Sequence, residues 1–452
     1  MVRSRDTLFI VRGTRFGAIA TLGLAAFLSS CGAKTTSHAF GDPIVVGVTL
    51  GLTKSFETLS PPLRNAIKLA ESQVNAGGGV LGRQIEYRVV DDTSTADGAR
   101  ARVSELIEGG AVAILGPLGS GQVPGSNEVA KAKNVVQISP TATSIVLNGD
   151  ALIGAFFRTT PDDTLQAAAV ARLGQFGPPP VSAEAGAGFV CSRMHIMYGD
   201  NDYGRSMQET ITSIYIANGQ PPPGKTAIPD APKNNYDADV ASAVFDNTVH
   251  PQCLVLILYE DTGAPIMSSY DRLKKLKPAN AVQFIVATDG LFTQGFLSNT
   301  RLDRQNAASS VAEGVYGTNP DTSPMTLEYN DFKALYKAYF DAEPDAFSAN
   351  AYDAAVLVAL GIAQAGTTSP AAIRDNIKTV SSGGRPYGPA NVADALRALQ
   401  PKKSPKEDVD YKGASGDVDF TDKVTSVKAG FITWKVQDGK FATVDHVGAD
   451  KL

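Results

Sequence analysis

The chain has 452 residues, which is enough for two or three domains of ordinary size. Hydrophobic residues make up 43% and charged residues 19% of the chain, a balance that is ordinary for a soluble globular protein. The formal net charge is −5, and no cluster of basic residues gives an electrostatic footprint for nucleic acid, so we expect no nucleic-acid partner.

The N-terminus has the pattern of an export signal. Arginines precede the apolar stretch 16–28 (FGAIATLGLAAFL), which is too short to span a bilayer and fits the core of a signal peptide. Residues 28–31 (LSSC) resemble the bacterial lipobox, in which small residues precede a cysteine that is lipidated. We therefore expect a lipoprotein signal peptide over 1–30, a lipid on Cys31, a polar tether over 31–42, and an exported protein anchored to the membrane. The alternative is an ordinary signal peptide with a chance cysteine.

A glycine-rich stretch follows the first predicted helix. Residues 61–75 show apolar positions at helical spacing, with two prolines at the start. Gly77, Gly79 and Gly82 then fit G-x-G-x-x-G, the spacing of dinucleotide-binding loops. In those loops the glycines follow a strand and open a helix, whereas here they follow a helix and lead into the strand pattern at 85–90. We interpret them as a helix end and a turn, and we expect no nucleotide cofactor.

Strand-like and helix-like segments alternate along the chain, which predicts α/β architecture with parallel sheets. A first cycle runs to about residue 160, and a second begins after the stretch FFRTTP. A third region, from about residue 314, contains a long buried helix at 348–366 and a terminal hairpin that turns at Asp438 and Gly439. The predicted strands lie at 44–50, 85–92, 111–117, 134–140, 194–199, 225–229, 253–259 and 282–288.

Hydroxyl groups follow two predicted strands of the first cycle. Ser120 lies in the segment GPLGSGQ between a strand and a helix, where the backbone N–H groups of a helix start form a natural anion site. Thr141 and Thr143 follow the strand at 134–140 and offer further donors for a carboxylate. The alternative for each is a hydroxyl-capped turn.

Three residues of the second cycle also follow strands. Tyr203 and Tyr259 offer apolar walls with polar tips, and Asp289 offers a negative charge for an amine. Ordinary packing of the tyrosines and a strand-end cap for Asp289 are the alternatives. Ligands of open α/β sheets bind at the carboxyl ends of the strands. A carboxylate anchor on one domain and an amine anchor on the other would suit an amino acid in a cleft.

Two cysteines remain after Cys31. Cys191 and Cys253 each lie at or just before an apolar run typical of a strand. An exported protein meets an oxidising compartment, so we predict a disulfide between them. The alternative is two buried thiols.

Residues for catalysis or metal binding are few. None of the four histidines belongs to a pair with metal-ligand spacing, and there is no C-x-x-C motif. The segment around Ser120 lacks both the lysine of a P-loop and the G-x-S-x-G of a serine hydrolase, and no histidine is evident as its base. We therefore expect no metal, no cofactor and no enzymatic activity.

The order and spacing of several segments resemble the type I periplasmic solute-binding proteins of ABC transporters, in the branched-chain amino acid (Leu/Ile/Val) class. The resemblance runs from about residue 43 to the end, apart from the proline-rich insertions. It is carried by NAGGGVLGRQIEYRVVDD, AILGPLGSG, ISPTATS, MYGDNDYG, VAEGVYGT and YKGASGDVDFTD.

This resemblance implies two doubly wound parallel-sheet lobes joined by three crossovers near residues 160, 315 and 415, closing on ligand as a Venus flytrap. The N-terminal lobe would comprise 43–160 with 315–415, and the C-terminal lobe 161–314 with 416–452. It implies a monomer that delivers a small amino acid to an inner-membrane ABC permease.

The resemblance also implies roles for individual residues. Ser120 and Thr143 would hold the ligand carboxylate, and Thr141 would offer its backbone carbonyl. Asp289, which stands where the family often has glutamate, would face the amine, and Tyr203 and Tyr259 would wall the pocket. The first ligand loop, GLTKSFETLSPP, departs from the family pattern, and there Phe56 or Leu59 would supply the wall.

Two other functions are open. Related lobes occur in lipoproteins that act through a protein surface, such as activators of cell-wall synthases, or that sense a ligand. Such a synthase activator would not need the anion site or Asp289. An exported hydrolase would need a base beside Ser120.

Overall fold

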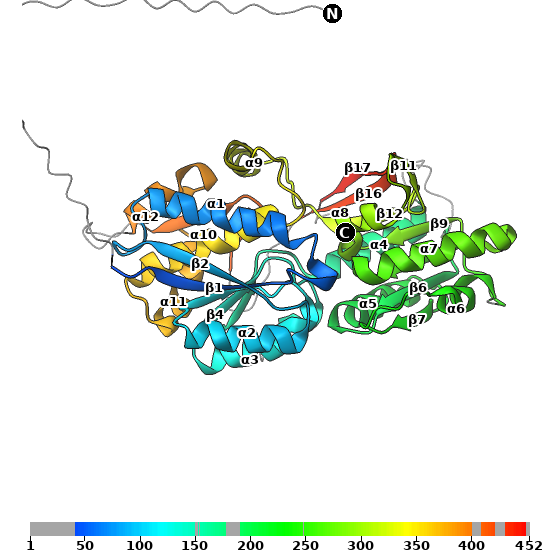
Figure 1. Cartoon of the computed structure of the whole chain (residues 1–452), viewed down its shortest axis with the longest axis horizontal. Coiled ribbons are helices and arrows are strands. Elements are labelled where there is room, and N and C mark those ends of the chain that lie inside the picture. Colours follow the sequence, from blue (N-terminus) through cyan, green and yellow to red (C-terminus); the bar gives the residue numbers. More distant parts are fainter. Residues whose placement is uncertain are drawn as a thin grey trace, which may run out of the picture. The chain divides into compact units, whose positions relative to one another are not determined.

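The computed structural model describes residues 41–149, 152, 154–177, 190–246, 248–399, 408–420 and 430–448. The predicted signal peptide, Cys31 and the tether up to residue 40 lie outside the described residues, as does most of the first proline-rich insertion. The described residues belong to one compact unit, which contains two α/β lobes (Figure 1).

The first lobe is built on a five-stranded sheet whose strands are all parallel, in the order β2-β1-β3-β4-β5. The apolar strand runs are nearly continuous because helices cover both faces of the sheet. Each of the four strands predicted in this region contains one of the observed strands. The strands are β1 (Ile44–Leu50), β2 (Ile85–Asp91), β3 (Ala113–Leu115), β4 (Val136–Ser139) and β5 (Phe156–Arg158).

The helices of the first lobe form a layer on each side of its sheet. Helices α1 and α10 pack together over one face, and α2 and α3 pack together over the other (Figure 1). The bounds are α1 (Ser60–Ala76), α2 (Ala96–Glu108), α3 (Val123–Ala132), α9 (Leu327–Phe340), α10 (Ser348–Ala365), α11 (Pro370–Asn376) and α12 (Val392–Ala398).

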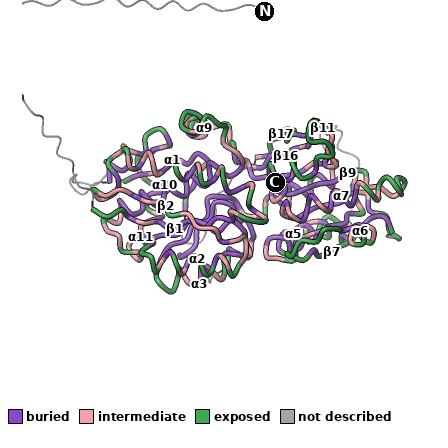
Figure 2. Tube along the Cα trace, in the orientation of Figure 1, coloured by how far each residue is buried: buried purple, intermediate pink, exposed green. Residues whose placement is uncertain are grey.

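Helix α10 is the long buried helix that the sequence predicts. Its residues are buried from Ser348 to Ala363, and small alanines let its neighbours approach on every side (Figure 2). Among the described residues, no single helix has the length and apolar character to cross a membrane. Helices α10 and α11, bent by 108° at their junction, meet that criterion only when taken as a pair.

The second lobe is built on a seven-stranded sheet in the order β17-β16-β12-β9-β8-β6-β7. Strands β7, β6, β8, β9 and β12 run parallel, and β16 and β17 add antiparallel strands at one edge. The strands are β6 (Met194–Gly199), β7 (Gly224–Ile228), β8 (Cys253–Ile257), β9 (Phe284–Ala287), β12 (Tyr316–Pro320), β16 (Phe431–Gln437) and β17 (Lys440–Val447). The predicted terminal hairpin is confirmed, with Asp438 and Gly439 at its turn.

The helices of the second lobe again form two layers. Helices α4 and α5 share one core with the sheet, and α6, α7 and α8 share the other. Their bounds are α4 (Asp163–Phe176), α5 (Asp202–Ala217), α6 (Asp237–Val240), α7 (Glu260–Leu276) and α8 (Gln294–Asn299).

The chain passes between the lobes after β5, after β12 and after β15. Strand β12 pairs with β9 and β16, so the second passage begins after Pro320. The third follows a small sheet of β13 (Arg385–Tyr387), β14 (Val409–Gly413) and β15 (Gly416–Asp417). This arrangement confirms the two-lobe fold with three crossovers, while the residue ranges assigned to each lobe stay a prediction.

Buried polar groups tie the passages together beside α10. The carboxyl group of Asp353 accepts hydrogen bonds from the Tyr411 hydroxyl at 2.7 Å and from the Ser415 backbone N–H at 2.7 Å. The Thr159 hydroxyl donates to the Asn350 carbonyl at 2.8 Å. The start of the first passage and the segment that leads into the third are therefore both anchored to the same helix.

The glycine-rich stretch ends α1 and turns into β2, as its position in the sequence predicts. Gly79 has a positive φ of 74°, and a Cβ there would lie 2.0 Å from the Arg83 carbonyl oxygen. Glycine is therefore required for the turn geometry rather than for a phosphate.

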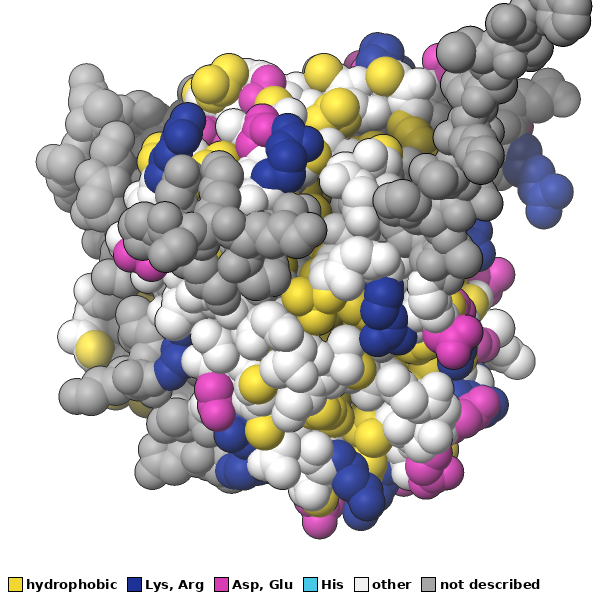
Figure 3. Space-filling view, turned by 90° about the vertical axis from the view of Figure 1, so that its left-hand side faces the viewer, with side chains coloured by type: hydrophobic (Ala, Val, Ile, Leu, Met, Phe, Trp, Pro, Cys, Tyr) yellow, Lys and Arg dark blue, Asp and Glu magenta, His cyan; other side chains and the backbone are white. Residues whose placement is uncertain are grey.

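Some elements have no clear signal in the sequence. A two-stranded hairpin of β10 (Arg301–Asp303) and β11 (Asn306–Ser310) lies between α8 and β12, and its short, polar strands lack a hydrophobic alternation. In the small sheet, β13 and β15 are likewise too short for an alternation, whereas β14 alternates buried and partly exposed residues. On the face shown in Figure 3, acidic and basic side chains are interspersed, and neither sign gathers in one area.

Cys191 and Cys253 are joined by a disulfide, with their Cα atoms 5.9 Å apart. Both residues are fully buried. Cys253 begins β8 and Cys191 precedes β6. These two strands are parallel neighbours, so the two sulfurs lie together at the N-terminal ends of the strands.

Candidate functional site

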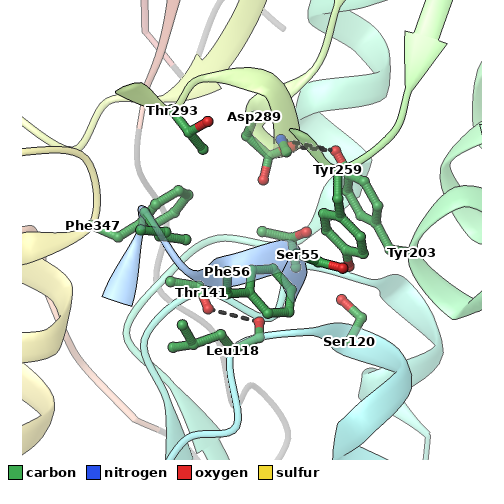
Figure 4. A pocket seen from close by; sticks show the side chains of 13 residues that line it. Ser55, Phe56, Leu118, Ser120, Thr141, Tyr203, Tyr259, Asp289, Thr293 and Phe347 are labelled. Carbon is green, nitrogen blue, oxygen red and sulfur yellow. Dashed lines mark hydrogen bonds between the residues drawn. The ribbon is translucent and has the colours of Figure 1, made fainter. Parts of the chain in front are cut away.

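A pocket lies between the two lobes, where loops from the carboxyl ends of both sheets meet (Figure 4). It contains about 400 Å³ of space when the open solvent at its mouth is included. All six candidate binding residues predicted from the sequence line it: Ser120, Thr141, Thr143, Tyr203, Tyr259 and Asp289. Whether they contact a ligand stays a prediction.

The first lobe lines the pocket with hydroxyl and apolar groups. The loop between β1 and α1 provides Ser55, Phe56 and Leu59. The sequence predicts that Phe56 or Leu59 supplies the pocket wall here, and both residues line the pocket. The loops after β3 and β4 provide Ser120 and Thr141. The hydroxyls therefore come from strand ends, as expected for an open α/β sheet.

The Ser120 hydroxyl remains able to donate to a ligand. Its oxygen accepts the Ser144 N–H at 3.2 Å, which leaves its proton available. The Thr141 hydroxyl instead donates to the Leu118 carbonyl at 2.7 Å, so its proton is used within the lobe (Figure 4). The Gln122 side chain accepts the Gly119 N–H at 2.7 Å and fixes the turn that carries Ser120.

Asp289 is the only charged residue among those that line the pocket. It follows β9, is 7% exposed, and accepts a hydrogen bond from the Tyr203 hydroxyl at 2.6 Å. Burial raises the pKa of Asp289, and the hydrogen bond from Tyr203 works against that shift. Figure 4 shows Asp289 and Ser120 on opposite sides of the pocket, so its two ends differ in chemistry.

Aromatic rings close one side of the pocket. Tyr203 and Tyr259 of the second lobe stack with centroids 5.4 Å apart, and Phe56 of the first lobe meets Tyr259 edge-on at 4.9 Å. Phe347, which precedes α10 with a left-handed φ of 60°, adds an apolar surface from the first lobe. The aromatic lining thus comes from both lobes.

Hydrogen bonds across the cleft hold the lobes together beside the pocket. The Ser55 hydroxyl donates to Asp261 at 2.6 Å, and the Thr58 hydroxyl donates to Glu260 at 2.6 Å. Elsewhere in the cleft, the Ser144 hydroxyl lies 2.8 Å from that of Ser206 on α5. The described conformation is therefore one in which the two lobes are closed on each other.

A larger part of the cleft, about 1470 Å³ when the open solvent at its mouth is included, adjoins this pocket. The two share Ser55, Phe56, Tyr203 and Tyr259, so these residues separate an inner pocket from an outer part of the cleft. The inner pocket collects the strand-end groups and is the better candidate for ligand binding.

Sequence reasoning did not identify Ser55, Thr293 or Phe347 as lining residues. Ser55 lies on the irregular turn Lys54–Phe56, and Phe347 comes from a loop far along the chain. Neither has a strand signal directly before it. No histidine or lysine lines the pocket, and among the described residues no group of three or more His, Cys, Asp or Glu is placed to hold a metal ion.

Two α/β lobes that close over a small pocket of hydroxyl, phenol and carboxyl groups have the architecture of a solute-binding protein. The chain belongs to the periplasmic binding protein family, whose family model matches residues 43–401. This confirms the resemblance found in the sequence.

Individual relatives agree with the family assignment. The chain is 26% identical over 419 residues to the chemotactic signal transduction system substrate-binding protein BasB of Halobacterium salinarum, with 89% of each chain covered. It is 21% identical over 355 residues to the Leu/Ile/Val-binding protein BraC3 of Rhizobium johnstonii. The aligned region covers 77% of this chain and 85% of BraC3. The solved leucine-binding protein LivK of Thermotoga maritima shares the fold, with a TM-score of 0.69, 16% identity, and coverage of 90% of this chain and all of that one.

Proposed function

We propose that the chain is an extracytoplasmic substrate-binding protein of an ABC transporter that captures a small amino acid in the inter-lobe pocket and delivers it to a permease. The observation that carries this proposal is the pocket itself, which places one buried carboxyl group opposite a set of neutral hydroxyls. An amino acid offers an ammonium to the first and a carboxylate to the second.

The proposed roles of the residues follow from this orientation. Ser120 and Thr143 hold the carboxylate, with backbone N–H groups beside them, and Thr141 contributes its backbone carbonyl. Asp289 holds the ammonium. Tyr203 and Tyr259 wall the pocket, and the ligand side chain lies against Phe56, Leu59 and Phe347. We propose that the protein acts without catalysis, as expected of a member of the periplasmic binding protein family.

A thermal-shift screen tests the proposal. A ligand at one hundred times its dissociation constant adds about 2.7 kcal/mol to stability, so a true ligand raises the melting temperature clearly. The screen compares the standard L-amino acids with matched carboxylates that lack the amine, and with matched amines. If none of the amino acids raises the melting temperature, the proposal is contradicted.

We propose that the protein is exported as a monomer and anchored through lipid on Cys31. The lobes would follow the ranges expected from the sequence, 43–160 with 315–415 and 161–314 with 416–452, except that the pairing of β12 moves the second boundary to Pro320. Replacement of Cys31 with alanine is then expected to release the protein from membranes. A Cys31→Ala protein that fractionates with membranes as the parent does would contradict the anchor.

A second candidate function is ligand sensing. It is favoured by the 26% identity to BasB, a substrate-binding protein of a chemotactic signalling system, over 89% of the chain. Uptake of radiolabelled ligand and the behavioural response to it separate the two functions in a strain that lacks this protein. Loss of uptake supports transport, whereas loss of the response alone supports sensing.

A further inference from the structure

Two adjacent acidic residues lie at the carboxyl end of β2, on the same edge of the first-lobe sheet as the loops that line the pocket. Asp91 is the last residue of the strand, and Asp92 follows it and is fully buried. Neither is among the residues that line the pocket. The Asp91 carboxyl group accepts the Thr93 N–H at 2.8 Å. That of Asp92 accepts the Ser94 N–H at 2.9 Å. The other hydrogen bonds of both acids reach segments that are distant in the sequence.

Asp91 holds the loop between β1 and α1, residues 51–59, which we call the Phe56 loop. The Asp91 carboxyl group accepts the Leu52 N–H at 2.9 Å and the Thr53 hydroxyl at 2.9 Å. The same loop carries Phe56 to the pocket (Figure 4). Asp91 therefore fixes the start of the segment from which this wall of the pocket is built.

Asp92 holds the turn between β3 and α3, residues 119–122, which we call the Ser120 turn. The Gln122 Nε2 donates to Asp92 at 3.1 Å, and the Gln122 Oε1 accepts the Gly119 N–H at 2.7 Å. Ser120 lies between these two ends of the turn. A Cβ at Gly119 would lie 3.1 Å from the Phe56 ring, so the Ser120 turn packs directly against the Phe56 loop. The two acids thus fasten two neighbouring segments of the pocket lining.

The turn that follows the two acids and leads into α2 has a strained backbone. Thr93 and Ser94 have left-handed φ angles of 56° and 53°, which are uncommon for residues other than glycine and especially for a β-branched threonine. Such strain persists only where the surrounding contacts fix it. From this turn the Ser94 hydroxyl donates to the Thr53 carbonyl at 2.6 Å, so the turn is bonded to the Phe56 loop as well. Positioning of the pocket segments would account for a conformation that the turn alone does not favour.

We propose that Asp91 and Asp92 are positioning residues that hold these two pocket segments in place before a ligand arrives. Asp91 positions the Phe56 loop, and Asp92, acting through Gln122, positions the Ser120 turn. Binding to groups that are already in place costs less conformational entropy, so the two acids raise affinity without touching the ligand. This inference rests on the proposed function and divides it. Asp92 serves recognition of the ligand carboxylate, whereas Asp91 serves the apolar wall and the closure contact of Ser55, which every ligand uses.

The first test needs no ligand and compares variants of the two adjacent acids with each other. Hydrogen–deuterium exchange, read by mass spectrometry on short peptides, follows the backbone N–H groups of the Phe56 loop and of the Ser120 turn. Asp91→Ala is expected to speed exchange about tenfold in the Phe56 loop and to leave the Ser120 turn unchanged, and Asp92→Ala is expected to do the reverse. A tenfold change corresponds to the loss of about one hydrogen bond. Equal acceleration of both segments by either variant, or acceleration of neither, would overturn the inference.

Two further variants separate positioning by Asp92 from a general loss of structure. Gln122→Met keeps the length of the side chain but lacks the amide donor and acceptor, so it is expected to loosen the Ser120 turn with Asp92 intact. Asp92→Asn keeps an acceptor for Gln122, so its Ser120 turn is expected to exchange as in the parent. An unchanged Ser120 turn in Gln122→Met would contradict the role of Asp92. The same holds if Asp92→Asn loosens the turn as much as Asp92→Ala does, because the hydrogen bond to Gln122 would then not be the cause.

The second test uses calorimetry with L-leucine and with 3-methylbutylamine, which lacks the carboxylate. Burial raises the pKa of Asp92 to about 6, so measurements at pH 8 keep its carboxyl group ionised. Gln122→Met is expected to lower the affinity for L-leucine about tenfold and that for 3-methylbutylamine by less than about twofold, because only L-leucine uses the Ser120 turn. Asp91→Ala is expected to lower both affinities by a similar factor.

A purely structural role of the Asp92–Gln122 bond predicts a different result. Gln122→Met would then weaken both probes alike, and that outcome would overturn the inference. If neither probe binds the parent protein, the proposed function fails. The exchange test decides the positioning of the two segments independently of either probe.

Discussion

The two lobes contribute opposite chemistry to one pocket. The first lobe offers neutral hydroxyls and apolar rings, and its sheet approaches the site through three strand-end loops. The second lobe offers a buried carboxyl group and two phenols, and its β6 region is fastened to β8 by a disulfide. We infer that the hydroxyl donors of the first lobe recognise the ligand carboxylate, and that the carboxyl group of the second lobe recognises the ligand ammonium. The predictions below test this division.

The largest effect is expected at Asp289, the charged group of the second lobe. Replacement with alanine leaves a buried ligand ammonium without its partner, which typically costs about 2–5 kcal/mol of binding free energy. Calorimetry with the ligand found in the screen measures the loss. Affinity within about twofold of the parent would contradict the amine anchor and favour a ligand without an amine.

Removal of the disulfide is expected to weaken the second lobe. The bond closes a loop with a sequence separation of 62 residues, and the double variant Cys191→Ala with Cys253→Ala should lose about 2–4 kcal/mol of stability. Denaturant unfolding of the parent and variant measures it. Mass spectrometry of unreduced, exported protein provides the control, and two alkylatable thiols in that material would contradict the bond.

His195 should make the second lobe sensitive to acid. Burial lowers the pKa of His195 to about 4, below the value of about 6.5 expected when the chain is unfolded. The unfolded chain therefore binds the extra proton first, and about 2–3 kcal/mol of stability is lost as the pH falls from 6.5 towards 4. His195→Gln should reduce this loss in denaturant unfolding at pH 7 and 4.5.

Buried acids act in the opposite direction and must be separated from this effect. Burial raises the pKa values of Asp92 and Asp353 to about 6, so their stabilising contribution is present below pH 4 and is lost as the pH rises through 6. Asp92 and Asp353 are present in the parent and in His195→Gln. Their contribution to the pH dependence of stability therefore cancels when the two proteins are compared. An unchanged acid dependence in the variant would show that His195 does not carry it.

A smaller effect on binding is expected at Ser120, on the hydroxyl side. Ser120→Ala removes one donor to a carboxylate, for which about 1.5–3 kcal/mol is expected, and backbone N–H groups remain. Thr141→Val is the matched control, because the Thr141 hydroxyl is already bonded to Leu118. Calorimetry should show a larger loss of affinity for Ser120→Ala. Equal losses would mean that Ser120 acts through the loop rather than on the ligand.

The sequence predicts those parts of the site that directly follow a strand. Ser120 and Asp289 come after short apolar runs, and the carboxyl ends of parallel strands meet at the edge where ligands bind. Ser55 has no such signal, because it lies on the irregular turn Lys54–Phe56 rather than directly after a strand.

The fold shows the same limit. Long apolar segments such as β1 and α10 were predicted because their hydrophobic pattern determines both their structure and their burial. The hairpin of β10 and β11 was not, because its short strands are polar and partly exposed. Phe347 reaches the pocket only through the left-handed backbone that precedes α10. Long-range placement therefore decides the pocket residues that have no local pattern.

The smallest effect is expected from the hydrogen bonds that join the lobes. Ser55→Ala removes the bond to Asp261, which is only partly buried, so water can replace the lost hydroxyl and we expect a net contribution of about 0.5–1.5 kcal/mol. This bond forms across the cleft, so its loss should weaken the closed state and lower the affinity for every ligand by a similar factor. Asp289→Ala, in contrast, should weaken ligands with an amine selectively. Calorimetry of L-leucine and 3-methylbutylamine on Ser55→Ala tests this. A loss confined to one of them would place Ser55 in ligand recognition rather than in closure.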